Sequence, residues 1–139
     1  MSDTAIEKTV FLGVPVDTAW AFLTKADKLE QWFFKTDADF EVGAAYTLYS
    51  REEEGAKRCW GEVLEMSAPS RLRQSFTIAP LGGVMTELLW ELNAVEGGTR
   101  IKLTHTGLEA AGEAAFGLMS ALDDGWDKHF AHMREAVAS

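Results

Sequence analysis

The 139-residue sequence has one cysteine, Cys59, and only three prolines. A single cysteine excludes an internal disulfide and any cysteine-rich metal site. Positive charge is also scarce, because 13 Lys and Arg stand against 22 Asp and Glu and give a formal net charge of −9. Proteins that bind nucleic acid need basic residues against the phosphates, so this charge argues against nucleic acid as a partner.

Long hydrophobic runs are absent as well. No stretch approaches the roughly 20 apolar residues that a membrane span requires, and the first residues lack the basic and apolar regions of a secretory signal. We therefore expect a cytoplasmic protein without membrane contact. The length and the 47% hydrophobic content predict a single globular domain over residues 1–139.

Aromatic residues, by contrast, are abundant. The chain contains five Trp, two Tyr and eight Phe. Each aromatic side chain buries roughly 150–250 Å², so this set can either build a dense core or line a cavity. Composition alone leaves both interpretations open.

Hydrophobic patterning predicts a strand at residues 6–12, then two short helices at 16–23 and 27–32, the second capped by Asp27. Further antiparallel strands are predicted at 36–40, 45–51, 57–66, 72–78, 84–94 and 99–107. A short helix near 109–116, a break, and a main helix at 119–137 follow. The main helix carries one apolar stripe, formed by Met119, Leu122, Trp126, Phe130, Met133 and Val137.

Five segments resemble motifs of the SRPBCC superfamily, also called START-like or helix-grip proteins. They are VPVDTAW at 14–20, LEQWF at 29–33, GEVLEM with the following P and RL at 61–72, GGTRIKLTH at 97–105 and GW at 125–126. In this order they are similar to the branch named after the activator of heat-shock protein 90 ATPase homologue. The resemblance covers about residues 6–137. It implies an α+β helix-grip fold, in which a curved antiparallel sheet of about seven strands surrounds the long C-terminal helix.

The resemblance also implies an apolar cavity between sheet and helix, since superfamily members bind lipids, sterols or polyketides. We expect a non-catalytic protein that binds a small apolar ligand there and uses no cofactor. The candidate ligand-binding residues are Trp32, Tyr46, Trp60, Gln74, Phe76, Thr86, Trp90, His105, Met119, Trp126 and Phe130. Tyr46, Gln74, Thr86 and His105 would be the polar anchors that orient the ligand. Plain core packing of the aromatics is the alternative.

Two other functions remain open. A few superfamily members are cyclases or hydrolases, and His105 could act as a general base beside Glu87 or Asp123. Strand alternation places Glu87 on the outer face, which disfavours that pair, and a hydrogen-bonded core histidine is the simpler interpretation. The family name also suggests a protein-interaction module that contacts a chaperone.

A metal site is not expected. The only cluster of suitable side chains is Asp123, Asp124, Asp127, His129 and His132. At 100° per helical residue, Asp123 and His129 flank the apolar stripe, whereas Asp124 and His132 turn toward solvent. Metal ions need three or four ligands around a common centre, and these side chains diverge.

Overall fold

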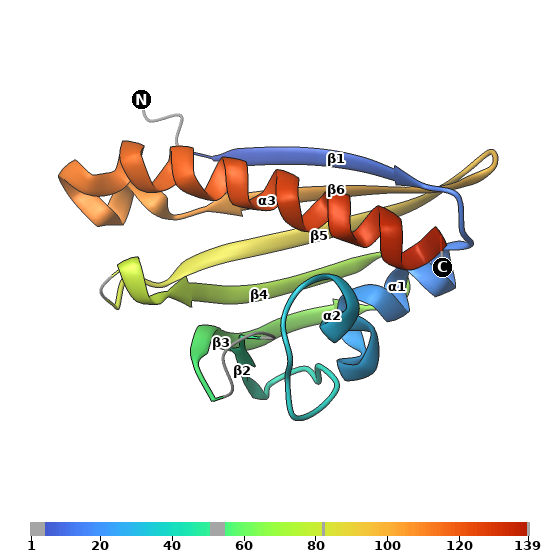
Figure 1. Cartoon of the computed structure of the whole chain (residues 1–139), viewed down its shortest axis with the longest axis horizontal. Coiled ribbons are helices and arrows are strands. Elements are labelled where there is room, and N and C mark those ends of the chain that lie inside the picture. Colours follow the sequence, from blue (N-terminus) through green and yellow to red (C-terminus); the bar gives the residue numbers. More distant parts are fainter. Residues whose placement is uncertain (1–4, 51–54, 82, 139) are drawn as a thin grey trace.

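The computed structural model describes residues 5–50, 55–81 and 83–138, and it places six strands in one antiparallel sheet (Figure 1). The strands are β1 (Ile6–Leu12), β2 (Ala45–Tyr49), β3 (Lys57–Ser67), β4 (Arg71–Ile78), β5 (Thr86–Val95) and β6 (Gly98–Thr106). Their spatial order is β1-β6-β5-β4-β3-β2. Strands β2 to β6 therefore form a meander, and β1 pairs with β6 at one edge.

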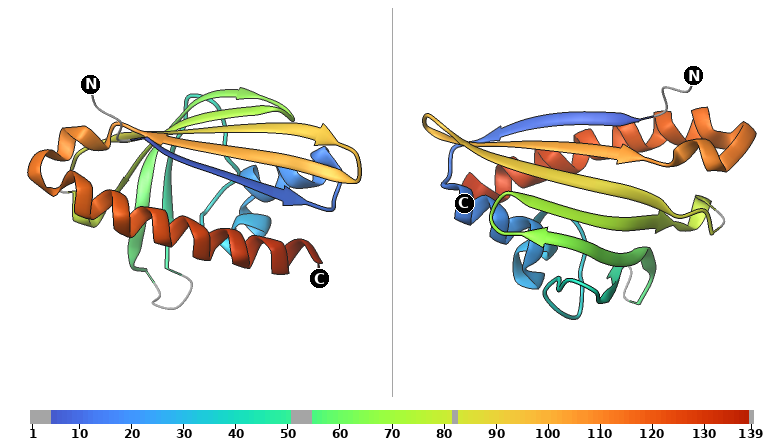
Figure 2. Two further views of the ribbon diagram at one scale, coloured as in Figure 1. Left: turned by 90° about the horizontal axis from the view of Figure 1, so that it is seen from above. Right: turned by 180° about the vertical axis from the view of Figure 1, so that it is seen from behind.

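The helices lie on one side of this sheet. They are α1 (Val16–Thr24), α2 (Ala26–Trp32) and α3 (Ala115–Ala138), with short 3-10 turns η1 (Ala79–Leu81) and η2 (Leu108–Ala114). Figure 2 shows α3 running along the concave side of the curved sheet, with α1 and α2 near its C-terminal end. This arrangement confirms the predicted α+β helix-grip fold. In the described part of the chain, no helix is both long and apolar enough to cross a membrane.

The described sheet has six strands, and the prediction of about seven was wrong at residues 36–40. The backbone of that segment bonds to the helix pair and not to a neighbouring strand. The N–H of Phe40 donates to the Thr24 carbonyl over 2.9 Å, and the Asp39 carboxylate accepts the N–H of Ala26 over 2.8 Å. These bonds hold the segment against the junction of α1 and α2.

Two predicted helix boundaries also need correction. Asp27 lies in the first turn of α2 and not at its N-cap, which is Lys25; the carboxylate of Asp39 instead satisfies a free N–H at this helix start. The main helix begins at Ala115, four residues earlier than predicted. The break that precedes it falls at Gly112, whose φ of +67° is readily adopted only by glycine.

The core lies between the sheet and α3. Alternate residues of β4, β5 and β6 point toward the helix and are buried, as the strand patterns predicted. From α3, Trp126, Phe130 and Met133 are buried against them, while Leu122 and Met119 are half-buried. The apolar stripe of the sequence is therefore the face by which α3 contacts the sheet.

At the other edge, Tyr46 links three strands through a close approach at Gly61. The two residues face each other in the β2–β3 register, and the Tyr46 hydroxyl donates to the Ser75 carbonyl of β4 over 2.5 Å. A Cβ atom at Gly61 would lie 2.1 Å from that same carbonyl oxygen. Glycine is thus required for the phenol to pass over β3 and reach β4.

Substituting Gly61→Ala is expected to lower the free energy of unfolding by about 1–3 kcal/mol, the usual cost of overpacking. Urea denaturation measures the change. Gly117→Ala is the matched control, because Gly117 is exposed on α3 and has open space at its Cβ position. An unfolding free energy for Gly61→Ala within 0.5 kcal/mol of wild type would show that β3 and β4 are spaced more loosely than described.

Candidate functional site

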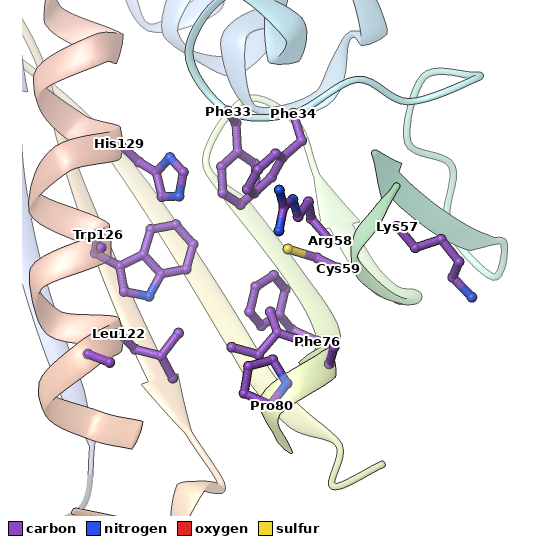
Figure 3. Close-up of a pocket in the computed structure, with 14 residues that line it drawn as sticks. Phe33, Phe34, Lys57, Arg58, Cys59, Phe76, Pro80, Leu122, Trp126 and His129 are labelled. Carbon is purple, nitrogen blue, oxygen red and sulfur yellow. The ribbon is translucent and has the colours of Figure 1, made fainter. Parts of the chain in front are cut away.

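A pocket of about 270 Å³ opens between α3 and strands β3 and β4 (Figure 3). This volume lies just below the roughly 300–1,000 Å³ of common ligand pockets, so the space corresponds to a small molecule. Figure 3 shows side chains from three directions: α3 on one side, the sheet beneath, and the residues after α2 at the top. The lining residues used below are Phe33, Phe34, Arg58, Cys59, Phe76, Leu122, Gly125, Trp126 and His129.

The α3 wall is one face of the helix. Leu122, Gly125 and His129 are separated by three and four residues, which places them one above another. Gly125 stands in the middle of this face, and no atom outside its own helix segment lies within 4 Å of its Cβ position. The missing side chain therefore leaves an opening in the wall that Leu122 and His129 flank.

The aromatic wall comes from the end of α2. Phe33 stacks on Trp32 with ring centroids 4.9 Å apart and on Trp126 at 5.5 Å, and Phe34 packs against Phe33 at 4.7 Å. The His129 ring meets Phe33 edge-on at 4.7 Å. Each of these rings is therefore packed against another ring, and together they form this side of the pocket.

Behind the pocket, a chain of hydrogen bonds joins α3 to the sheet. The indole N–H of Trp126 can only donate, so His105 accepts it at Nδ1 over 3.2 Å. The Thr86 hydroxyl donates to the Phe76 carbonyl over 2.6 Å, and it lies 2.8 Å from His105 Nε2. The proton of His105 is therefore on Nε2 and is donated to Thr86.

This chain makes His105 a neutral core residue. Its side chain is fully buried, and burial lowers its pKa to about 4. Both ring nitrogens are engaged, so neither can take a proton from a ligand. The carboxylates considered as its partners bind elsewhere: Glu87 pairs with Arg73 at 3.1 Å, and Asp123 pairs with Lys8 at 2.7 Å.

Among the described residues, the other polar groups of the pocket are few. Burial raises the pKa of the Cys59 thiol, which keeps it protonated. None of the described residues that line the pocket is Asp or Glu. The acidic cluster of α3 is divided, since Asp127 joins Asp123 on Lys8 while Asp124 pairs with Lys128. Within the described ranges, no group of three His, Cys, Asp or Glu could hold a metal ion.

Of the eleven residues predicted to bind ligand, Phe76 and Trp126 line this pocket. Six others are buried but do not line it: Trp32, Gln74, Thr86, Trp90, His105 and Phe130. Met119 is half-buried against the core, and the ring of the half-buried Trp60 lies under the Lys57 ammonium at 4.6 Å. Tyr46 lines a separate hollow beside residues 36–47.

The four predicted polar anchors bond within the protein. Thr86 and His105 belong to the chain described above, and Tyr46 donates to Ser75. Gln74 accepts the indole N–H of Trp90 over 3.0 Å. In the described structure these side chains hold the sheet and helix together, and none of them lines the pocket beside α3.

Four residues of the pocket were not predicted from the sequence, namely Phe33, Arg58, Gly125 and His129. One signal was available: a glycine between Leu122 and His129, at helical spacing and beside the apolar stripe, marks a gap on a helix face. Arg58 offered no comparable signal, because its position depends on an irregularity in β3.

The curved antiparallel sheet, the helix along its concave face and the pocket between them define the class of helix-grip proteins. The sequence model of the family described as Activator of Hsp90 ATPase homolog 1-like protein matches residues 13–138. The chain therefore belongs to this family, as the motifs predicted.

Solved structures show the same fold at low sequence identity. Protein MLL2253 from Mesorhizobium loti is 19% identical over 96% of both chains, with a TM-score of 0.82. The Aha1 dimer from Colwellia psychrerythraea is 16% identical over 95% of this chain and 94% of that one, with a TM-score of 0.76. DynU16, from the dynemicin biosynthetic locus, is 20% identical with a TM-score of 0.80; 99% of this chain matches 48% of DynU16. No curated protein matches the sequence.

The lowered pKa of His105 predicts a specific pH dependence of stability. The unfolded chain takes up a proton near pH 6.5, whereas the folded chain does so only near pH 4. Stability is therefore full above about pH 6.5 and falls as the pH drops toward 4. Between pH 7.5 and 5, this residue should remove about 2 kcal/mol from the unfolding free energy.

Urea denaturation across this pH range checks the effect. In His105→Gln, the decrease of about 2 kcal/mol in the unfolding free energy between pH 7.5 and 5 should be absent. The control His132→Gln, on the exposed side of α3, should show the same decrease as wild type. Equal pH slopes for wild type and His105→Gln would contradict the neutral, buried histidine.

Proposed function

We propose that this protein binds a small hydrophobic ligand in the pocket between α3 and strands β3 and β4, and that it catalyses no reaction on it. The observation that carries this proposal is the opening at Gly125 in the α3 wall, across from the aromatic wall at the end of α2. A helix that packs fully on its sheet would present a side chain there. Here the helix face between Leu122 and His129 is left empty.

The pocket walls favour an apolar guest. Phe33, Phe34, Phe76 and Trp126 present ring surfaces to it, and removing apolar surface from water stabilises a complex by about 25 cal/mol per Å². The rings are already packed on one another, so binding orders few side chains. Such preorganised walls lower the entropic cost of association.

The state of the described polar groups supports binding without chemistry. A cyclase or hydrolase needs a general base or nucleophile within reach of its substrate. Both ring nitrogens of His105 form hydrogen bonds within the core, and the thiol of Cys59 is protonated. His129 lines the pocket, where its ring meets Phe33 edge-on at 4.7 Å.

Filling the opening should abolish binding without unfolding the protein. In Gly125→Leu, the new side chain occupies the pocket, and replacing glycine inside a helix stabilises it by up to about 1 kcal/mol. The control Gly117→Leu makes the same change on the same helix, at an exposed position that lines none of the described pockets.

Octanol is a suitable apolar probe, and its binding can be followed by backbone amide chemical shifts in NMR spectra. Wild type and Gly117→Leu should show saturable shifts at residues 122–129 and at Phe76, and Gly125→Leu should show none. Equal octanol affinity in all three proteins would place the ligand elsewhere and overturn the proposal.

A further inference from the structure

A second hollow, of about 340 Å³, continues the pocket toward its outer end. The two share five lining residues, namely Phe33, Phe34, Arg58, Gly125 and His129. The additional lining of the outer hollow is polar and consists of Ser50, Lys128 and His132. The combined site thus changes from apolar at Phe76 and Trp126 to polar at its outer end.

A bulge in β3 places Arg58 at the junction of the two hollows. Leu48 pairs with Cys59, and the next residue, Tyr49, pairs with Lys57, so Arg58 is one residue in excess on its strand. Bulges of this kind redirect a side chain from strict alternation. Figure 3 shows the Arg58 guanidinium beside Phe34, on the pocket side of β3.

Its neighbour Lys57 points away from the pocket in the same view, and its ammonium lies over the Trp60 ring at 4.6 Å. Of the two consecutive basic side chains, therefore, only Arg58 is directed toward the pocket. It lines both hollows, whereas Lys57 lines the inner one alone.

The described lining of the two hollows is basic, whereas the whole molecule is acidic. The chain has a net charge of −9, yet none of the described residues lining either hollow is acidic. Arg58 and Lys128 are basic, and His129 and His132 add two imidazoles. Lys128 also pairs with Asp124 at 3.1 Å, but both side chains are exposed and such pairs are weak. On α3, the carboxylates of Asp123 and Asp127 bind Lys8.

We propose that the ligand is an amphipathic carboxylic acid, whose hydrocarbon chain fills the inner pocket and whose carboxylate binds Arg58 in the outer hollow. This inference rests on the proposed function and adds the chemical class of the ligand. The planar guanidinium matches a carboxylate with two parallel hydrogen bonds. One directed charge at the end of an apolar pocket also fixes which way the ligand enters.

The test compares octanoate with octanol, which share the chain and differ in the charge of the head. Isothermal titration calorimetry is carried out on wild type, Arg58→Gln and Arg100→Gln. Arg100 is the matched control, because it is exposed on β6, bonds to Asn93 and lines neither hollow. Both substitutions remove one positive charge.

Wild type and Arg100→Gln should bind octanoate about two- to fivefold more tightly than octanol, the gain expected of an ion pair with an exposed arginine. Arg58→Gln should bind octanoate no better than octanol, while its octanol affinity stays unchanged. Raising the salt concentration should reduce the preference in wild type, because exposed charges are screened.

The unfavourable outcomes separate the two proposals. If octanol and octanoate bind equally, or if Arg58→Gln keeps the preference, the carboxylate inference is wrong and the apolar pocket stands. If neither probe binds to wild type, the proposed function fails and this inference fails with it.

Discussion

The indole of Trp126 is the contact on which the rest of the structure depends. Its N–H must find an acceptor in the core, and His105 Nδ1 is that acceptor. An unpaired buried donor would cost about 1–3 kcal/mol, so sliding or rotating α3 along the sheet is penalised. The ring also stacks on Phe33 and Phe130, with centroids 5.5 and 6.0 Å away. One side chain thereby sets the position of the helix relative to both the sheet and the end of α2.

That position determines the pocket. With Trp126 fixed, Gly125 lines the pocket between α3 and strands β3 and β4, and Leu122 and His129 form the edges of the opening. Buried polar groups hold this geometry. Behind the site, hydrogen bonds link Trp126 to His105 and His105 to Thr86. The pocket itself is left with aromatic walls inside and basic groups at its outer end. Trp126 takes part in both, because its N–H bonds to His105 in the core while its ring lines the pocket.

The sequence predicted the supporting framework well. Alternation along residues 72–78, 84–94 and 99–107 identified the buried face of the sheet, and the stripe through Trp126 and Phe130 identified the matching face of the helix. Both patterns are local periodicities, which arise because one face of each element is buried in the core. The strand predicted at 36–40 failed because Asp39 and Phe40 bond to the helix junction, and such tertiary partners leave no periodic trace.

The residues that line the pocket were harder to predict, because their positions also depend on tertiary partners. Polar side chains on an inward face, such as Thr86 and Gln74, suggested ligand anchors, but their hydrogen bonds close within the protein. A buried polar group must be satisfied, and the sequence does not say whether the partner is a ligand or the fold itself. Arg58 depends on a register shift between β2 and β3 that arises only once the strands pair. The sequence shows a glycine at helical spacing between Leu122 and His129. Only the position of the sheet opposite Gly125 makes this gap part of a pocket.

The most direct test of this account is a crystal structure of the protein with ω-bromo-octanoate, in which anomalous scattering locates the bromine atom. The account predicts one strong bromine peak in the inner pocket, between Phe76 and Trp126, with the carboxylate at Arg58. A bromine peak outside this pocket, or a carboxylate buried among the aromatic rings with the bromine at Arg58, would contradict it.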